Sequence, residues 1–178
     1  MAIINRTKKI DSKVLTDVVE DEIMNFLREN YYGIRDNVEF EWDGSECIVN
    51  IRGKLYIQNM KMAKMTNGQF RFGKAQSVDI SLSNIETLEG CPTYVSGDFN
   101  CRLTRIKDLT GLGTIGGDLC LSYCQNLTSL KGAPVYLGGS VYMKGCKNIK
   151  DFGHWEGRIC GEVHLEGSIF NRLEKELC

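Results

Sequence analysis

The sequence predicts an α+β protein, mostly β, whose larger part is a right-handed β-solenoid with one parallel sheet. Three observations predict this class. A Gly-x-apolar-x-apolar unit returns every 20–22 residues in the C-terminal half, an amphipathic segment and a hairpin pattern precede it, and most of the 19 glycines lie after residue 50, where a tightly turned chain needs them. A unit of this length cannot bury its apolar side alone, so successive units must stack.

The first 52 residues predict an N-terminal α/β cap. Apolar residues recur at helical spacing over residues 12–30, and Ser12 or Asp11 can cap the first turn. Residues 38–42 alternate like a half-buried strand, the Asp-Gly pair at 43–44 is a hairpin-turn signal, and residues 47–51 return as the second strand. We expect this helix and hairpin to cover one end of the solenoid, because an open parallel edge invites aggregation.

The repeat is marked by a glycine at the head of each strand. These glycines are Gly97, Gly117, Gly139 and Gly161, which are 20, 22 and 22 residues apart. Strand residues two apart point the same way, so stacked coils predict continuous inward ladders made of Phe99/Cys101, Leu119/Leu121, Val141/Met143 and Val163/Leu165. A second apolar column of the same period precedes the strands and consists of Val95, Ile115, Leu137 and Ile159.

The solenoid is expected to span residues 53–167. Weaker coils are indicated at residues 53–57 and 78–82, ahead of the clear repeats. Residues 168–178 predict a short amphipathic helix that covers the C-terminal end, because Ser168 is followed by Ile169, Phe170, Leu173 and Leu177.

Residues from about 78 to 166 resemble the leucine-rich-repeat-like arrays of tailed-phage and bacterial proteins. The turns Leu-Glu-Gly-Cys-Pro at 88–92 and Leu-Lys-Gly-Ala-Pro at 130–134 carry the resemblance, and Cys124 and Cys146 fall where such repeats keep a buried asparagine or cysteine. The coil at 97–103 is expected to lack the turn that would hold its own ladder residue. The resemblance implies a leucine-rich-repeat-like coil and a phage accessory protein that binds and inhibits or redirects a host protein of defence or gene expression.

Bulk properties exclude several classes of protein. The net charge is −1, so the chain as a whole has no nucleic-acid signature. No apolar stretch is long enough for a signal peptide or a membrane span, so we expect a cytoplasmic protein, in the host cytoplasm if phage-encoded, with no membrane partner. The eight cysteines include no Cys-x-x-Cys pair, and we expect free thiols and no metal.

No constellation of residues predicts catalysis, so we expect neither an enzyme nor a cofactor. Residues 111–116 fit Gly-x-Gly-x-x-Gly, but strand-like residues follow where a dinucleotide site needs a helix. His154 and His164 are explained as surface polar residues. The expected nearness of Asp98 and Asp118 follows from coil stacking.

The outer face of the strands is the first candidate site. Positions between ladder residues form three columns, which are Asp98/Asp118/Ser140/Glu162, Asn100/Cys120/Tyr142/His164 and Arg102/Ser122/Lys144/Glu166. The predicted partner-binding residues of this grid are Asp98, Asn100, Arg102, Asp118, Cys120, Tyr142, Lys144, Glu162 and His164. Strands lie about 4.8 Å apart, and Tyr142 is the natural anchor because interface hot spots favour tyrosine. In the alternative, the charges of this face only maintain solubility.

Residues 58–74 are the second candidate site, and they predict a basic β-hairpin. Its pairing would place Lys64 opposite Arg71 and Lys61 opposite Lys74. Like charges in such positions are mildly destabilising, so a hairpin that keeps them indicates an anionic partner, either a protein or a nucleic acid. In the alternative, the methionines and phenylalanines of this segment pack on the first coil and its cations are merely solvated.

The leading hypothesis is a non-catalytic protein-binding module. One alternative is a nucleic-acid-binding protein that uses the hairpin over residues 58–74. Another is a protein that binds or sequesters a small ligand, such as a nucleotide, between the cap and the solenoid. The sequence leaves the identity of the partner and the oligomeric state open.

Overall fold

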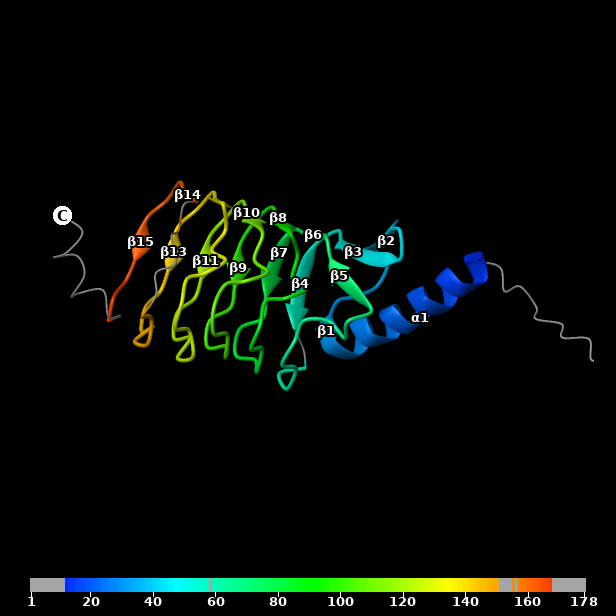
Figure 1. Ribbon diagram of the computed structural model, residues 1–178, viewed down its shortest axis with the longest axis horizontal. Coiled ribbons are helices and arrows are strands. Elements are labelled where there is room, and N and C mark those ends of the chain that lie inside the picture. Colours follow the sequence, from blue (N-terminus) through cyan, green and yellow to red (C-terminus); the bar gives the residue numbers. More distant parts are fainter. Residues whose placement is uncertain (1–11, 58, 151–154, 156, 168–178) are drawn as a thin grey trace, which may run out of the picture.

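The computed structural model describes residues 12–57, 59–150, 155 and 157–167, which form an elongated molecule (Figure 1). The described part is mostly β with one helix, and its stacked parallel strands form a β-solenoid of about five turns. The predicted mostly-β class and the solenoid are therefore confirmed. In Figure 1, α1 lies at one end and the coils follow one another toward β15 at the other.

Helix α1 (Ser12–Asn30) covers the residues that the sequence predicts. Ile23 and Leu27, which are four residues apart and so share a helix face, are fully buried. Phe26 meets Phe70 edge to face, with ring centroids 5.8 Å apart. The helix is thus joined to the β structure by one apolar face.

The larger sheet has seven strands in the order β1-β4-β7-β9-β11-β13-β15. These are β1 (Tyr31–Tyr32), β4 (Lys54–Ile57), β7 (Ser77–Asp79), β9 (Phe99–Asn100), β11 (Leu119–Cys120), β13 (Val141–Tyr142) and β15 (Val163–His164). Only β1 is antiparallel to its neighbour. The predicted inward ladder is confirmed, because Phe99, Leu119, Val141 and Val163 are in register, and the weaker coils add Leu55 and Val78 to it.

A second parallel sheet runs beside the first, so the expectation of a single parallel sheet is wrong. Its order is β14-β12-β10-β8-β6. The strands are β6 (Lys74–Ala75), β8 (Tyr94–Val95), β10 (Thr114–Ile115), β12 (Tyr136–Leu137) and β14 (Arg158–Ile159). The inward residues of these strands are Ala75 and the members of the predicted upstream apolar column. The residues of that column therefore lie on strands. Two-residue strands are too short for alternation to reveal them in the sequence.

The third sheet has the order β2-β3-β5 and contains the predicted hairpin of β2 (Val38–Asp43) and β3 (Glu46–Ile51). The basic hairpin predicted over residues 58–74 is wrong. Strand β5 (Phe70–Phe72) pairs in parallel with β3, whereas β4 pairs with β1 and β7. The physical reason is burial, because Phe70 and Phe72 pack edge to face against each other and Phe72 against Tyr31.

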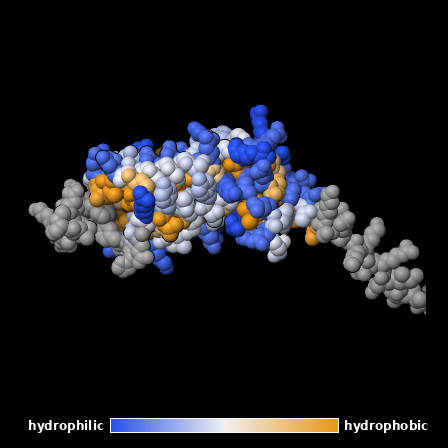
Figure 2. Space-filling model, turned by 90° about the horizontal axis from the view of Figure 1, so that it is seen from above, coloured by the Kyte–Doolittle hydropathy of each residue, from blue (hydrophilic) through white to orange (hydrophobic). Residues whose placement is uncertain are grey.

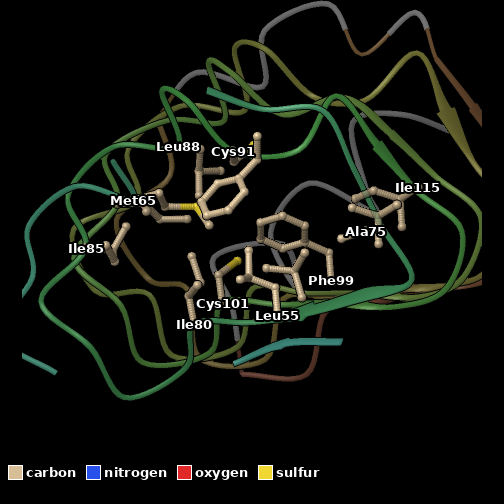
Figure 3. Packing of buried hydrophobic residues seen from close by; sticks show 14 of the residues in the cluster. Leu55, Met65, Ala75, Ile80, Ile85, Leu88, Cys91, Phe99, Cys101 and Ile115 are labelled. Atoms are coloured by element: carbon tan, nitrogen blue, oxygen red, sulfur yellow. The ribbon is translucent and has the colours of Figure 1, made fainter. Parts of the chain in front are cut away.

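A single cluster of buried apolar residues runs from α1 through the coils. Figure 3 shows its cross-section, in which Leu55 and Phe99 of the larger sheet face Ala75 and Ile115 of the second sheet. Leu88, Cys91, Met65 and Ile85 close the opposite side from the turns. The helix and the repeats therefore share one core, as layered domains do.

A ladder of small polar side chains runs inside one corner of the solenoid and consists of Ser83, Thr104, Cys124 and Cys146, which we call the polar ladder. The expectation that the coil at 97–103 lacks the turn to hold its ladder residue is wrong, because a turn at residues 102–103 precedes Thr104, which donates to the Cys101 carbonyl at 2.8 Å. Cys124 donates to the same carbonyl and Cys146 to that of Leu121, both at 3.0 Å. The buried thiols therefore satisfy backbone groups of the preceding coil.

Residues 1–11 and 168–178, at the two ends of the chain, are not among the described residues. The capping helix predicted over residues 168–178 lies outside the described residues, as does His154. Among the residues that are described, no helix has the length and apolar character needed to cross a membrane.

Candidate binding face

The seven-stranded sheet carries one continuous line of side chains on its outer face, which we call the outward column. It consists of Tyr32, Tyr56, Asp79, Asn100, Cys120, Tyr142 and His164, each in register with the next. Every member is at least partly exposed. The column places aromatic rings at both ends and polar groups in the middle.

The four members from Asn100 to His164 were predicted, whereas the first three were missed. Tyr56 and Asp79 each follow a ladder residue, as Asn100 follows Phe99, so carrying the alignment toward the N-terminus would have found them. Tyr32 lies on the antiparallel strand β1, outside the repeat, and no signal in the sequence marks it.

Tyr142 and His164 form a stacked pair at one end of the outward column. Their ring centroids are 4.5 Å apart and the ring planes differ by only 5°. The Nε2 atom of His164 lies 3.5 Å from a carboxylate oxygen of Glu162, which is 82% exposed. Each ring holds the other in place, so the pair offers a preorganised aromatic surface.

The middle of the column is held by hydrogen bonds. The amide of Asn100 donates to one carboxylate oxygen of Asp79 at 3.2 Å and accepts from the backbone N–H of Arg102 at 3.1 Å. The other oxygen of Asp79 accepts from the N–H of Ser81 at 2.9 Å. These two side chains therefore have fixed orientations before any partner arrives.

The first predicted column is bonded within the solenoid. A carboxylate oxygen of Asp98 accepts from the N–H of Asp118 at 2.8 Å, and one of Asp118 accepts from the N–H of Ser140 at 2.7 Å. The hydroxyl of Ser140 accepts from the N–H of Glu162 at 3.0 Å. Asp98, Asp118 and Ser140 thus join successive coils, whereas the carboxylate of Glu162 is 82% exposed and approaches His164.

The third predicted column is also partnered. The guanidinium of Arg102 lies 5.5 Å from the ring centre of Tyr123. Ser122 is buried and donates to the Tyr142 carbonyl at 3.4 Å. The ammonium of Lys144 lies 3.0 Å from Glu166, whose hydrogen bond and charge raise the pKa of Lys144. These contacts order the rim of the outward column.

The three cations predicted at the basic hairpin do not form one strip. Lys64 and Arg71 line the same hollow, of about 510 Å³, but Glu46 and Glu89 line it too. Arg71 forms an ion pair with Glu46 at 3.0 Å. Lys61 is exposed and is not part of that lining. The charges of the hollow are therefore balanced, which gives an anionic partner little preference for it.

The described residues include no group of three or more His, Cys, Asp or Glu side chains able to hold a metal ion. Cys120 is partly exposed in the outward column, whereas Cys91 and Cys146 are buried and burial raises the pKa of both thiols to about 12. A thiol with so high a pKa is a poor nucleophile near neutral pH. These buried cysteines act as packing and hydrogen-bonding residues.

The second sheet presents a different face. Its outward residues include Tyr94, Thr114 and Tyr136, of which Tyr94 is 47% and Tyr136 40% exposed. The second sheet lies at the top of Figure 1, and Figure 2 shows the molecule from that side. The middle of this side is pale, which means that its hydropathy is near neutral. These tyrosines provide a comparison for those of the outward column.

No family model, no curated protein and no solved structure matches this chain. The fold and the candidate site nevertheless define a class, which is a β-solenoid with ordered side chains on an exposed sheet face.

Proposed function

We propose that this chain is a non-catalytic protein-binding module whose outward column receives the partner. The observation that carries the proposal is the stacked pair of Tyr142 and His164 on the outer sheet face. Tyrosine is enriched among interface hot spots, and a ring that is already held in place loses little conformational entropy on binding. Solenoids commonly bind through such a continuous face.

A macromolecular partner fits this surface better than a small ligand does. Small-molecule sites are concave and mostly apolar. The hollow at Lys64 and Arg71 is lined instead by Glu46, Glu89 and other polar residues. The outward column, in contrast, extends over seven strands, which is about 29 Å at 4.8 Å per step. A line of that length matches a protein surface or an extended segment.

We also propose that each coil is leucine-rich-repeat-like and that the N-terminal region caps the solenoid. The polar ladder supports a leucine-rich-repeat-like coil, because its members recur at the position where such repeats keep a buried polar residue. The antiparallel pairing of β1 with β4 supports the N-terminal region as a cap, since it ends the run of parallel strands. The repeat's resemblance to phage arrays supports a host protein as the partner.

Site-specific photo-crosslinking in the cell that makes the protein tests the proposal. A photoreactive phenylalanine is placed at position 142 and, in a matched control, at position 136 of the second sheet. We expect one discrete protein adduct from position 142, absent from position 136 and lost when His164→Ala is added. Adducts that are the same at both positions, or none at position 142, would contradict the proposal.

A further inference from the structure

A groove lies at the other end of the outward column from the stacked pair. Its volume is about 320 Å³, and the residues that matter to its chemistry are Tyr32, Tyr56, Met60, Asp79, Ser81 and Leu82. Tyr32, Tyr56 and Asp79 are consecutive members of the outward column. Any partner that lies along the column meets this groove.

The walls of the groove are unusually apolar for an exposed surface. Tyr32 is 59%, Met60 43% and Leu82 62% exposed, and such clusters mark interaction sites. Leu82 also has a positive φ of 59°, at the coil position where Gly145 and Gly167 stand in later coils. The coil turn imposes this backbone conformation, and at Leu82 it projects an exposed leucine side chain over the groove.

Among the described residues that line the groove, Asp79 is the only charged one. Its two carboxylate oxygens each accept one hydrogen bond, from Ser81 and from Asn100, so its orientation is fixed. Each carboxylate oxygen has a further acceptor site. The groove therefore combines a long apolar wall, two tyrosine rings and one anchored negative charge.

We propose that this groove receives an arginine side chain of the partner protein. The methylene stem of arginine would lie along Met60 and Leu82, as such stems do on apolar surfaces. The planar guanidinium would stack on a tyrosine ring and donate to Asp79. Lysine offers a compact point charge without the planar fork, so arginine fits this set of groups better.

This inference rests on the proposed function in assigning the groove to the same partner. The groove and the stacked pair would then form two anchors on one face. Tyr56 and Tyr142 are separated by four strand steps, which is about 19 Å. An arginine in the groove would set the register of the partner along the column.

Small probes test the groove without the partner. N-acetyl-arginine amide, N-acetyl-lysine amide and N-acetyl-citrulline amide are titrated into the full chain labelled at its methionine methyl groups, and the Met60 signal is followed by NMR. Citrulline replaces one guanidinium nitrogen with oxygen and is neutral. We expect the arginine probe to shift Met60 saturably and to bind at least five times more tightly than the other two.

Two variants and one control locate the effect. Asp79→Asn is expected to remove the preference for arginine over citrulline. Leu82→Gly, which alters no hydrogen bond of Asp79, is expected to weaken arginine binding severalfold while the spectrum stays folded. Glu86→Gln, an exposed carboxylate that does not line the groove, should bind as the natural chain does.

Equal affinity for arginine and citrulline, tighter binding of lysine, or no shift at Met60 would overturn the arginine assignment. These outcomes are separate from the crosslinking result. A chain that prefers arginine but gives no adduct at position 142 keeps the groove and loses the proposed anchor at Tyr142. The reverse pattern keeps the anchor and loses the groove.

Discussion

At the residue scale, one position of each coil has a left-handed backbone. Leu82, Leu103 and Tyr123 have positive φ, as do Gly145 and Gly167 at the same coil position. This conformation costs an L-residue about 1–2 kcal/mol. The coil turn therefore imposes the conformation, and the sequence meets it with glycine in some coils and with a side chain in others.

Leu82→Gly should stabilise the protein by up to about 1 kcal/mol, because relief of the strain exceeds the added entropy of glycine in the unfolded chain. The side chain of Leu82 is 62% exposed, so little packing is lost. Urea unfolding followed by circular dichroism measures the change. Leu82→Ala is the matched control and should be the less stable of the two, since its Cβ keeps the strain. Alanine equal to glycine would contradict this account.

Buried thiols give the protein a predictable response to alkaline pH. Burial raises the pKa of Cys91 and Cys146 to about 12 and that of Cys101 well above its usual value. In the unfolded chain these thiols lose their protons at lower pH, so between the two pKa values the folded state holds more protons. The contribution of these three thiols to stability is therefore fully present below about pH 8.5 and is lost as pH rises toward 12.

Cys146→Ser provides the measurement. Cys146 donates to the Leu121 carbonyl of the preceding coil. A serine hydroxyl also donates, as the hydroxyls of Ser83 and Thr104 do to carbonyls of their own coils, but it does not titrate in this range. Above pH 9, the unfolding free energy of the variant should fall less steeply with pH than that of the natural chain. The difference in slope should correspond to about one proton fewer released on unfolding. Identical slopes would show that the Cys146 thiol is not protected.

At the scale of the element, the corner between the two sheets depends on glycine. A Cβ on Gly139 would lie 2.1 Å from a carboxylate oxygen of Asp118 and 2.7 Å from the backbone of Gly117. The same oxygen accepts from the N–H of Ser140. The hydrogen bond between the coils therefore requires the close approach that glycine permits. The same arrangement recurs one coil earlier with Asp98 and Gly117.

Gly139→Ala should destabilise the chain by about 2–3 kcal/mol, because backbone must move to admit the methyl group. Asp118→Ala should cost about 1 kcal/mol, through the loss of one hydrogen bond to the N–H of Ser140. Chemical denaturation gives both values. Asp118→Asn keeps the acceptor oxygen and should recover most of the loss. A larger effect for Asp118→Ala than for Gly139→Ala would contradict the assigned importance of close approach.

Elements also mark the limit of what the sequence could predict. Helix α1, the β2–β3 hairpin and the inward ladder followed from periodicity, because each has several residues in a regular pattern. The second sheet did not, since its strands have two residues each. Strand β5 was assigned to a hairpin because its true partner, β3, is distant in sequence and parallel.

The candidate site was predictable to the extent that it follows the repeat. Asn100, Cys120, Tyr142 and His164 were found because outward positions alternate with ladder positions. Alternation could not separate side chains that face a partner from those, such as Asp98 and Asp118, that bond to the next coil. The groove at Tyr32 requires β1 to pair with β4, a contact that no repeat contains.

At the scale of the whole molecule, a solenoid is stabilised mainly by contacts between neighbouring coils. The burial of the inward ladder residues changes along the axis of the solenoid. Leu119 and Val141 are fully buried, whereas Val163, the ladder residue of β15, is 47% exposed. Each internal coil is packed on both sides, so stability should decline from the middle of the array toward β15.

Hydrogen exchange of the full chain should reveal this gradient. The N–H groups of Val141 and Met143 bond to carbonyls of Glu162 and His164, in the coil whose ladder residue is least covered, whereas those of Phe99 and Cys101 bond to the coil of β11. If coils open from the C-terminal side, the first pair should exchange at least about tenfold faster than the second, a difference of about 1.4 kcal/mol in opening free energy. Equal protection at the two places would mean that the array opens as one unit, because a global opening exposes all coils together. Graded protection would instead place the Tyr142–His164 pair in the more easily opened part of the column and the arginine groove near the more stable part. A partner bound at Tyr142 should then slow hydrogen exchange most at Val141 and Met143.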